Sequence, residues 1–114
     1  MINIKIYIPS ILLFAFNTFA SDKIEVEIPK GSQHEECFYI NNKIALEYEY
    51  STNSPLDFNF HYHDDNGMNF LVKLAKSSEN KKTIKPLKNK QVYCLMWVNS
   101  EDKPATLTYH FTME

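Results

Sequence analysis

The chain has 114 residues and a formal net charge of −2, and all of its basic side chains apart from histidine are lysines. Nucleic-acid sites usually combine a clustered basic face with the fork of the arginine guanidinium, so this composition argues against a nucleic-acid partner. Only two glycines are present, which excludes a glycine-rich loop of the kind that cradles phosphates. The length is that of one small domain.

The first twenty residues have the layout of a signal peptide. Lys5 precedes an apolar run over residues 6–16, and a short polar stretch ends in small residues at 18 and 20. The apolar run is about half of the ~20 residues that a membrane-spanning helix needs. We therefore expect cleavage after Ala20 and an exported protein, in the periplasm or outside the cell, with no stable membrane insertion after the signal is removed.

Two cysteines, Cys37 and Cys94, remain in the expected mature domain, residues 21–114. A domain of this size buries proportionately little surface and gains from a covalent link. In an exported chain an even number of cysteines indicates a disulfide, which would contribute about 4 kcal/mol in the chain-entropy model. Two separate buried thiols are the alternative.

Apolar and polar residues alternate with a period of two through the whole mature region, which predicts β-strands and no long helix. The expected strands are 24–28, 36–40, 44–50, 56–63, 68–75, 91–99 and 105–113. The strand 91–99 is apolar on both faces, which is typical of a central strand covered on both sides. The lysine-rich residues 76–90 predict a solvated loop. Six to eight short strands predict an all-β fold, a two-sheet antiparallel β-sandwich of jelly-roll type.

The order of these segments resembles a GOLD (Golgi dynamics) domain. An alternating strand, a proline, a polar loop, Cys-Phe-Tyr and a Leu-x-Tyr-x-Tyr strand follow one another in IEVEIPKGSQHEECFYI and ALEYEY, and LDFNFHY, VYCLMWVNS and TLTYHF resemble the later strands. The likeness covers nearly all of residues 24–112. It implies an eight-stranded sandwich for protein–protein recognition, with a disulfide at the positions of Cys37 and Cys94. The family's cargo receptors continue into a coiled coil and a membrane helix, and this chain stops at Glu114, so the cargo-receptor role is not implied.

The stretch LDFNFHYHDDNG predicts an edge or near-edge strand, followed by a tight turn at Asn66-Gly67. Parity places Phe58, Phe60 and Tyr62 in the core. It places His61 and His63 in water, because slipping the register by one residue would bury a carboxylate and two imidazoles.

The same histidines are the best candidates for a metal site, since residues two apart on a strand project to one face. Asp57 could add an oxygen ligand and His110, on the outward face of the last strand, a third imidazole. Imidazoles suit zinc or copper(II). Closed zinc sites need four ligands at recognisable spacing, so the sequence leaves open both a metal site and a solvated face.

A second candidate surface is formed by Tyr93, Leu95 and Trp97, which share one face of the strand 91–99. They either pack beneath a neighbouring element or anchor a protein interface, where Trp and Tyr are enriched.

Catalytic patterns are weak. The serines lie in expected turns and loops without a Gly-x-Ser-x-Gly elbow, and the paired carboxylates, Asp64-Asp65 and Glu35-Glu36, are sequence neighbours that point apart. We therefore expect an exported, non-enzymatic module that binds another protein or an envelope component. The alternatives are a periplasmic metal-binding protein that uses His61 and His63, and an inhibitor or immunity-type protein that caps a secreted enzyme.

Overall fold

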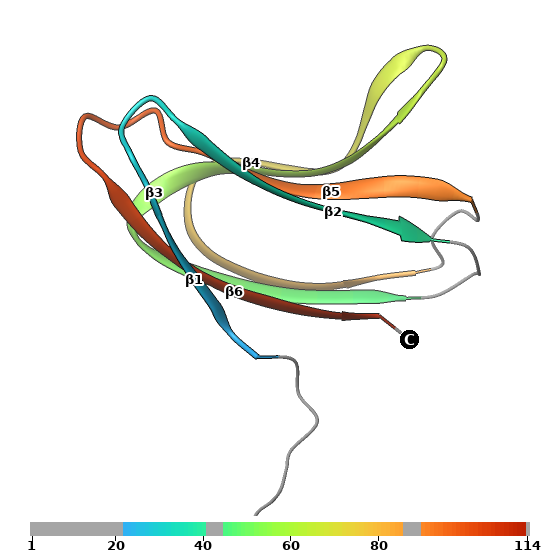
Figure 1. Ribbon diagram of the computed structural model, residues 1–114, viewed down its shortest axis with the longest axis horizontal. Coiled ribbons are helices and arrows are strands. Elements are labelled where there is room, and N and C mark those ends of the chain that lie inside the picture. The colour runs from blue at the N-terminus through green and yellow to red at the C-terminus, as the bar shows by residue number, and fades with distance from the viewer. Residues whose placement is uncertain (1–21, 41–44, 86–89, 114) are drawn as a thin grey trace, which may run out of the picture.

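The computed structural model describes residues 22–40, 45–85 and 90–113, so the expected signal peptide and its cleavage site lie outside the described residues. Six strands form in these segments (Figure 1). They are β1 (Ile24–Ile28), β2 (Gln33–Ile40), β3 (Leu46–Asp64), β4 (Gly67–Ile84), β5 (Gln91–Val98) and β6 (Ala105–Met113). No helix in the described part of the chain is long and apolar enough to cross a membrane.

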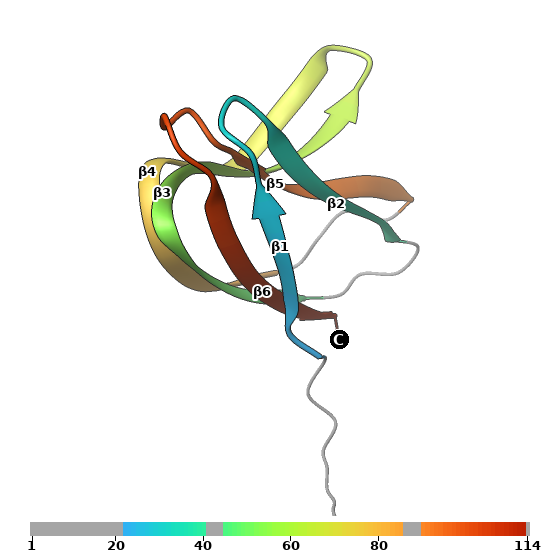
Figure 2. The ribbon, with the colours of Figure 1, turned by 60° about the vertical axis from the view of Figure 1, so that its left-hand side comes forward.

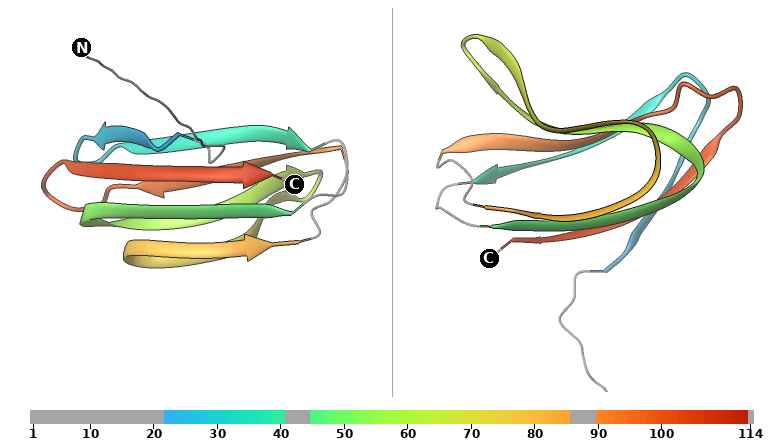
Figure 3. Two further views of the ribbon diagram at one scale, coloured as in Figure 1. Left: turned by 90° about the horizontal axis from the view of Figure 1, so that it is seen from below. Right: turned by 180° about the vertical axis from the view of Figure 1, so that it is seen from behind.

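The six strands make one antiparallel sheet that curls into two facing layers. Its order is β1-β6-β3-β5-β2, and β4 also pairs with β3. The first half of β3 pairs with β6 over Leu46–Thr52, and the second half pairs with β5 over Asp57–Tyr62. Figure 3 shows β3 and β4 turning together through a U, so the same two strands belong to both layers. The all-β, antiparallel prediction is confirmed, with the layers joined through two long strands.

The polar run Ser51 to Pro55, expected to separate two strands, is instead the bend inside β3. The register of β3 against β4 shifts between Ser51 and Leu56 and again between Leu56 and Phe58. Such irregularities locally bend and twist a strand without ending it. At the bend the hydroxyl of Thr52 donates to the carbonyl of Ser54 over 2.8 Å. Local hydrogen bonding of this kind lets the chain turn a corner while remaining extended.

The inward faces follow the predicted parity. Leu46, Tyr48, Tyr50, Phe58 and Phe60 on β3 are all buried. They meet aromatic residues of β5 and β6, and Trp97 lies with its ring centroid 4.6 Å from that of Tyr109. Fully burying a large apolar side chain stabilises the fold by about 1.5–3 kcal/mol, so this cluster supplies much of the folding free energy.

The expected lysine-rich loop is largely strand, which corrects the prediction. β4 continues to Ile84, with Lys81 opposite Glu49 and Lys82 opposite Tyr48. In the described residues β4 pairs with β3 alone, so it is an edge, and lysines are common on edge strands because they oppose association with other edges. Two polar residues in this part of β4 accept tyrosine hydroxyls: Tyr48 donates to Asn80 Oδ1 over 2.5 Å, and Tyr50 donates to Ser77 Oγ over 2.8 Å.

The hairpin between β3 and β4 forms as predicted, with its turn one residue earlier. Asp64 pairs with Gly67, which leaves Asp65-Asn66 as the two-residue loop, and Gly67 takes a φ of 112°. The strand that carries LDFNFHYHD is near-edge, as one of the two predicted alternatives has it, because it pairs with the edge strand β4 on one side and with β5 on the other. Figures 1 and 2 show the tip of this hairpin standing away from the rest of the molecule.

The predicted disulfide is present. Cys37 on β2 and Cys94 on β5 face each other directly in the ladder, with their Cα atoms 4.1 Å apart. The bond therefore ties β2, an outer strand of the sheet, to its only paired neighbour in the described chain.

Candidate functional site

The layer built from β2, β5, the second half of β3 and the first half of β4 has one face in the core and one face outside. We call the second of these the outer face. The ladder registers place Cys37 opposite Cys94, Cys94 opposite His61, and His61 opposite Phe70. Two residues further along these strands, on the same face, Tyr39 lies opposite Val92. The disulfide and His61 thus occupy the middle of this face.

Apolar side chains gather on and beside the outer face. Of the seven large hydrophobic residues that are exposed in the described chain, five belong to this region: Tyr39, Met68, Phe70, Leu71 and Val92. We call these five the apolar patch. Leu71 is exposed because it has no opposite residue: Phe60 pairs with Val72 and His61 pairs with Phe70, so Leu71 is the extra residue of a bulge.

His61 is fully buried, which corrects the prediction that it faces water; His63 is exposed as predicted. Parity does put His61 on the outer face, but its neighbours cover it. Its ring centroid lies 5.1 Å from that of His63 and 6.0 Å from that of Phe70. On a third side stands Glu35 of β2, whose Oε2 is 3.3 Å from His61 Nε2.

The polar contacts of His61 are few. Nδ1 lies 2.5 Å from Oδ1 of Asn59. Nε2 has no hydrogen-bond partner among the described residues, and its contact with Glu35 is an ion-pair distance without hydrogen-bond geometry. Burial holds the pKa of this imidazole below its ordinary value of 6.5, and the nearby His63 also lowers it, while Glu35 opposes both effects.

The other expected metal ligands lie elsewhere. Asp57 accepts hydrogen bonds from the backbone N–H of Lys76 over 3.0 Å and from the hydroxyl of Ser100 over 2.9 Å. These bonds hold the pKa of its carboxyl below 3.8. His110 is on β6 in the opposite layer, where Nε2 is 3.2 Å from Glu49 Oε1. The structure therefore separates Asp57 and His110 from His61 and brings Glu35 to it.

Tyr93, Leu95 and Trp97 belong to the core. Each has at most 1% of its surface exposed, because this face of β5 looks toward the other layer. They are not available as an interface, which corrects that alternative. On the opposite face of β5, Val92 is exposed, Cys94 is buried, and Met96 and Val98 are half-buried, so this side of the strand is only partly covered.

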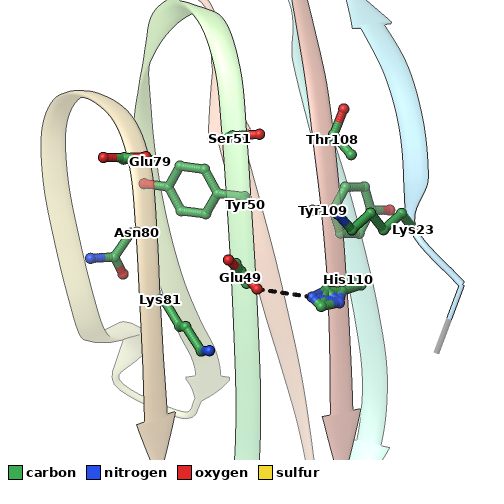
Figure 4. A pocket seen from close by; sticks show the side chains of 10 residues that line it. All are labelled: Lys23, Glu49, Tyr50, Ser51, Glu79, Asn80, Lys81, Thr108, Tyr109 and His110. Carbon is green, nitrogen blue, oxygen red and sulfur yellow. Dashed lines mark hydrogen bonds and ion pairs between the residues drawn. The ribbon is translucent and has the colours of Figure 1, made fainter. Parts of the chain in front are cut away.

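A hollow of about 380 Å³ lies on the other layer, across β6, β3 and the second half of β4 (Figure 4). Glu49, His110, Glu79, Lys81 and Lys23 contribute to its lining. Acidic and basic groups alternate there, and the pair formed by Glu49 and His110 satisfies part of that charge. The hollow therefore favours neither a cationic nor an anionic ligand.

No protein-family model matches this chain, and no curated protein matches its sequence. Its GOLD resemblance is thus carried by the quoted segments alone. Among solved structures, the crystal structure of PirA is similar with a TM-score of 0.57 at 6% identity, over 86% of this chain and 100% of that one. PliG from Aeromonas hydrophila, a periplasmic inhibitor of g-type lysozyme, is similar with a TM-score of 0.55 at 8% identity, over 87% of this chain and 93% of that one. At these identities the likeness shows the fold.

Proposed function

We propose that this protein is an exported, non-enzymatic module that binds another protein through the apolar patch on its outer face. The observation that carries the proposal is the concentration of five of the seven exposed large hydrophobic side chains of the described chain in one region of the surface. Single exposed apolar residues are ordinary, whereas a connected group of them with polar groups around it is typical of a binding surface.

The patch is held rigidly, which favours binding. The disulfide between Cys37 and Cys94 lies in the middle of the outer face and fixes β2 against β5. The hairpin that carries Met68 and Phe70 is anchored in the core at its base, because Phe60 of the same hairpin is fully buried. Side chains that are ordered before binding lose less entropy when a partner arrives.

The shape favours a concave partner. The tip of the β3–β4 hairpin projects from the molecule (Figure 2). Met68 and Phe70, which belong to this hairpin, are exposed. Enzyme active sites are concave and largely apolar, so a secreted enzyme is the class of partner that best fits a projecting apolar hairpin. The fold that this chain shares with PliG supports an inhibitor role, and the resemblance to GOLD domains supports protein recognition in general.

A photo-cross-linking amino acid at Leu71 tests the proposal, with the same substitution at Met113 as the control. Both side chains are exposed, at 38% and 41%, but Met113 ends β6 in the opposite layer. We expect a protein adduct from the Leu71 position alone. Equal adducts from both positions would contradict a defined binding face.

The identified partner should then be purified and its affinity measured against Phe70→Asp and Met113→Asp variants. We expect Phe70→Asp to weaken binding at least tenfold, since a buried aromatic anchor commonly contributes that much, and Met113→Asp to leave it unchanged. Inhibition of a g-type lysozyme that disappears in Phe70→Asp would identify the inhibitor class directly.

A further inference from the structure

We propose that Glu35, His61 and His63 form a binding site for a divalent transition-metal ion, zinc or copper(II), on the outer face. The site is independent of the protein-binding proposal. It joins two strands that are not paired with each other, because β5 lies between β2, which carries Glu35, and β3, which carries both histidines. The sequence separates Glu35 from the histidines, and only the sheet order brings them together.

The protonation state of the His61 ring leaves a lone pair on Nε2, the nitrogen that faces Glu35, where a cation would bind. In the tautomer with the ring proton on Nδ1, that nitrogen donates to Oδ1 of Asn59, 2.5 Å away, and the oxygen can only accept. Nε2 is then the unprotonated nitrogen of the neutral ring. Imidazoles that bind metals commonly donate their second nitrogen to a carbonyl in this way, which fixes the ring and its basic atom.

That lone pair is buried and faces a carboxylate. His61 is 0% exposed, and Nε2 has no hydrogen-bond partner in the described chain. The atom closest to it in the ion-pair contact, Oε2 of Glu35, also carries lone pairs and no proton when ionised. Two acceptors that face each other, one of them buried, repel one another unless a positive centre joins them.

The separation suits a metal ion. Zinc bonds to imidazole nitrogen and to carboxylate oxygen are about 2.0–2.2 Å long, so two such ligands at a tetrahedral angle lie about 3.4 Å apart. Nε2 of His61 and Oε2 of Glu35 are 3.3 Å apart. A charge-assisted N–H···O bond would instead be about 2.7–2.9 Å.

His63 can supply a third ligand when its exposed side chain turns toward Glu35 and His61. As the described side chains stand, the ligand atoms of these three residues do not all lie within 4.8 Å of one another. The ring of His63 lies 5.1 Å from that of His61 and stands nearly perpendicular to it, at 84°. His63 is exposed and the side chain of Glu35 is 36% exposed, so both can adjust around an ion that enters from solvent. The sulfur atoms of Cys37 and Cys94 lie close to Glu35, but in the disulfide they offer no thiolate. Two imidazoles and one carboxylate match the preferences of zinc and copper(II).

The opposite layer offers a matched control. Glu49 and His110 form a pair of nearly the same length, 3.2 Å between Oε1 and Nε2, but this contact is a hydrogen bond. His110 is also partly exposed and has no buried unpartnered nitrogen. A Glu49→Gln variant therefore removes a surface carboxylate beside a histidine without touching the proposed site.

The experiment is calorimetric titration of the tag-free exported protein, with its disulfide intact and without reductant, using zinc chloride and copper(II) chloride as the probes. We expect a single equivalent to bind with a dissociation constant in the micromolar range. Glu35→Gln and His63→Gln should each weaken binding at least tenfold, and Glu49→Gln should not change it. Because Glu35 and His63 are exposed, these variants should fold even if a His61 variant does not.

Nitrogen-15 NMR of the histidine rings gives a second readout. We expect the metal-free protein at neutral pH to show His61 with its proton on Nδ1, and the Nε2 resonance to shift when zinc is added. Four results would overturn the proposal: no binding at millimolar metal, unchanged affinity in Glu35→Gln, loss of binding in Glu49→Gln, or binding that requires reduction of the disulfide. The last would assign the ion to the thiolates of Cys37 and Cys94.

Discussion

Replacing Phe60 with alanine should destabilise the protein more than the same change at Phe70, a residue of the same hairpin. Phe60 is fully buried, with its ring centroid 5.4 Å from that of Tyr93 and 6.3 Å from that of Phe38. Phe70 is 44% exposed on the outer face. The two substitutions remove the same atoms, so their difference measures the burial alone.

The expected cost of Phe60→Ala is about 3–5 kcal/mol, since truncation of a buried aromatic loses its transfer free energy and leaves a cavity. Small domains are stable by about 5–15 kcal/mol, so this one change removes a large share of the total. In a domain of this size it corresponds to a fall in melting temperature of roughly 12–40 °C. Phe70→Ala should stay within about 1 kcal/mol, because part of the ring already contacts water.

Urea unfolding measures both variants, with the fluorescence of Trp97 as the probe. Trp97 is the only tryptophan in the chain and is fully buried, so unfolding moves it into water. The disulfide must stay oxidised in every sample, so that the unfolded states match. A cost below about 1.5 kcal/mol for Phe60→Ala, or equal costs for the two variants, would refute the assignment of Phe60 to the core.

Two further predictions concern the disulfide and the corner at Asp57. Replacing both Cys37 and Cys94 with serine should lower the free energy of unfolding by about 4 kcal/mol, because the bond closes a loop with a sequence separation of 57; an unchanged urea midpoint would contradict this. The hydrogen bonds from Lys76 and Ser100 hold the pKa of folded Asp57 below 3.8. As the pH falls, the unfolded chain therefore takes up this proton first, and the stability that Asp57 contributes is complete only above about pH 5. Asp57→Asn should therefore cost about 1 kcal/mol at neutral pH, and its difference from the wild type in urea unfolding should shrink as the pH falls through the folded pKa. A difference that stays constant down to about pH 2.5 would contradict the linkage.

Which residues point inward was predictable because the side-chain period of a strand is local. Leu46, Tyr48, Phe58 and Phe60 are buried as their alternation predicts. The same rule finds the β3–β4 hairpin, whose turn chemistry lies within a few residues of Gly67. Alternation does not depend on which strand lies next to which, so these predictions needed no knowledge of the sheet order.

The predictions that were wrong concern positions whose environment depends on residues from other strands, and the sequence does not show which strands are adjacent. His61 was expected in water from parity, and it is on the predicted face, but Phe70 and the disulfide strands cover it. The sequence of residues 76–84 predicts a loop because this part of the edge strand has polar contacts with the tyrosines, such as Asn80 with Tyr48, and therefore lacks a sustained apolar alternation. Glu35 gave no signal as a neighbour of His61 for the same reason: their contact crosses β5.

The arrangement of the outer face separates stability from recognition on the same strands. Along β3, Phe60 points into the core and the next residue, His61, points to the outer face. Along β5, Leu95 points into the core and its neighbour Cys94 points to the outer face. The outer positions can therefore vary without opening a cavity in the core, and the core residues still hold them in fixed places. His61 and the disulfide-bonded Cys94 are exceptions, because both are buried on the outer side, and His61 is the polar one of the two. A polar residue kept buried where a valine or threonine would fit the strand equally well costs desolvation free energy. That cost is understandable if the unprotonated nitrogen has a ligand, which is why His61 is the residue on which the proposed metal site depends.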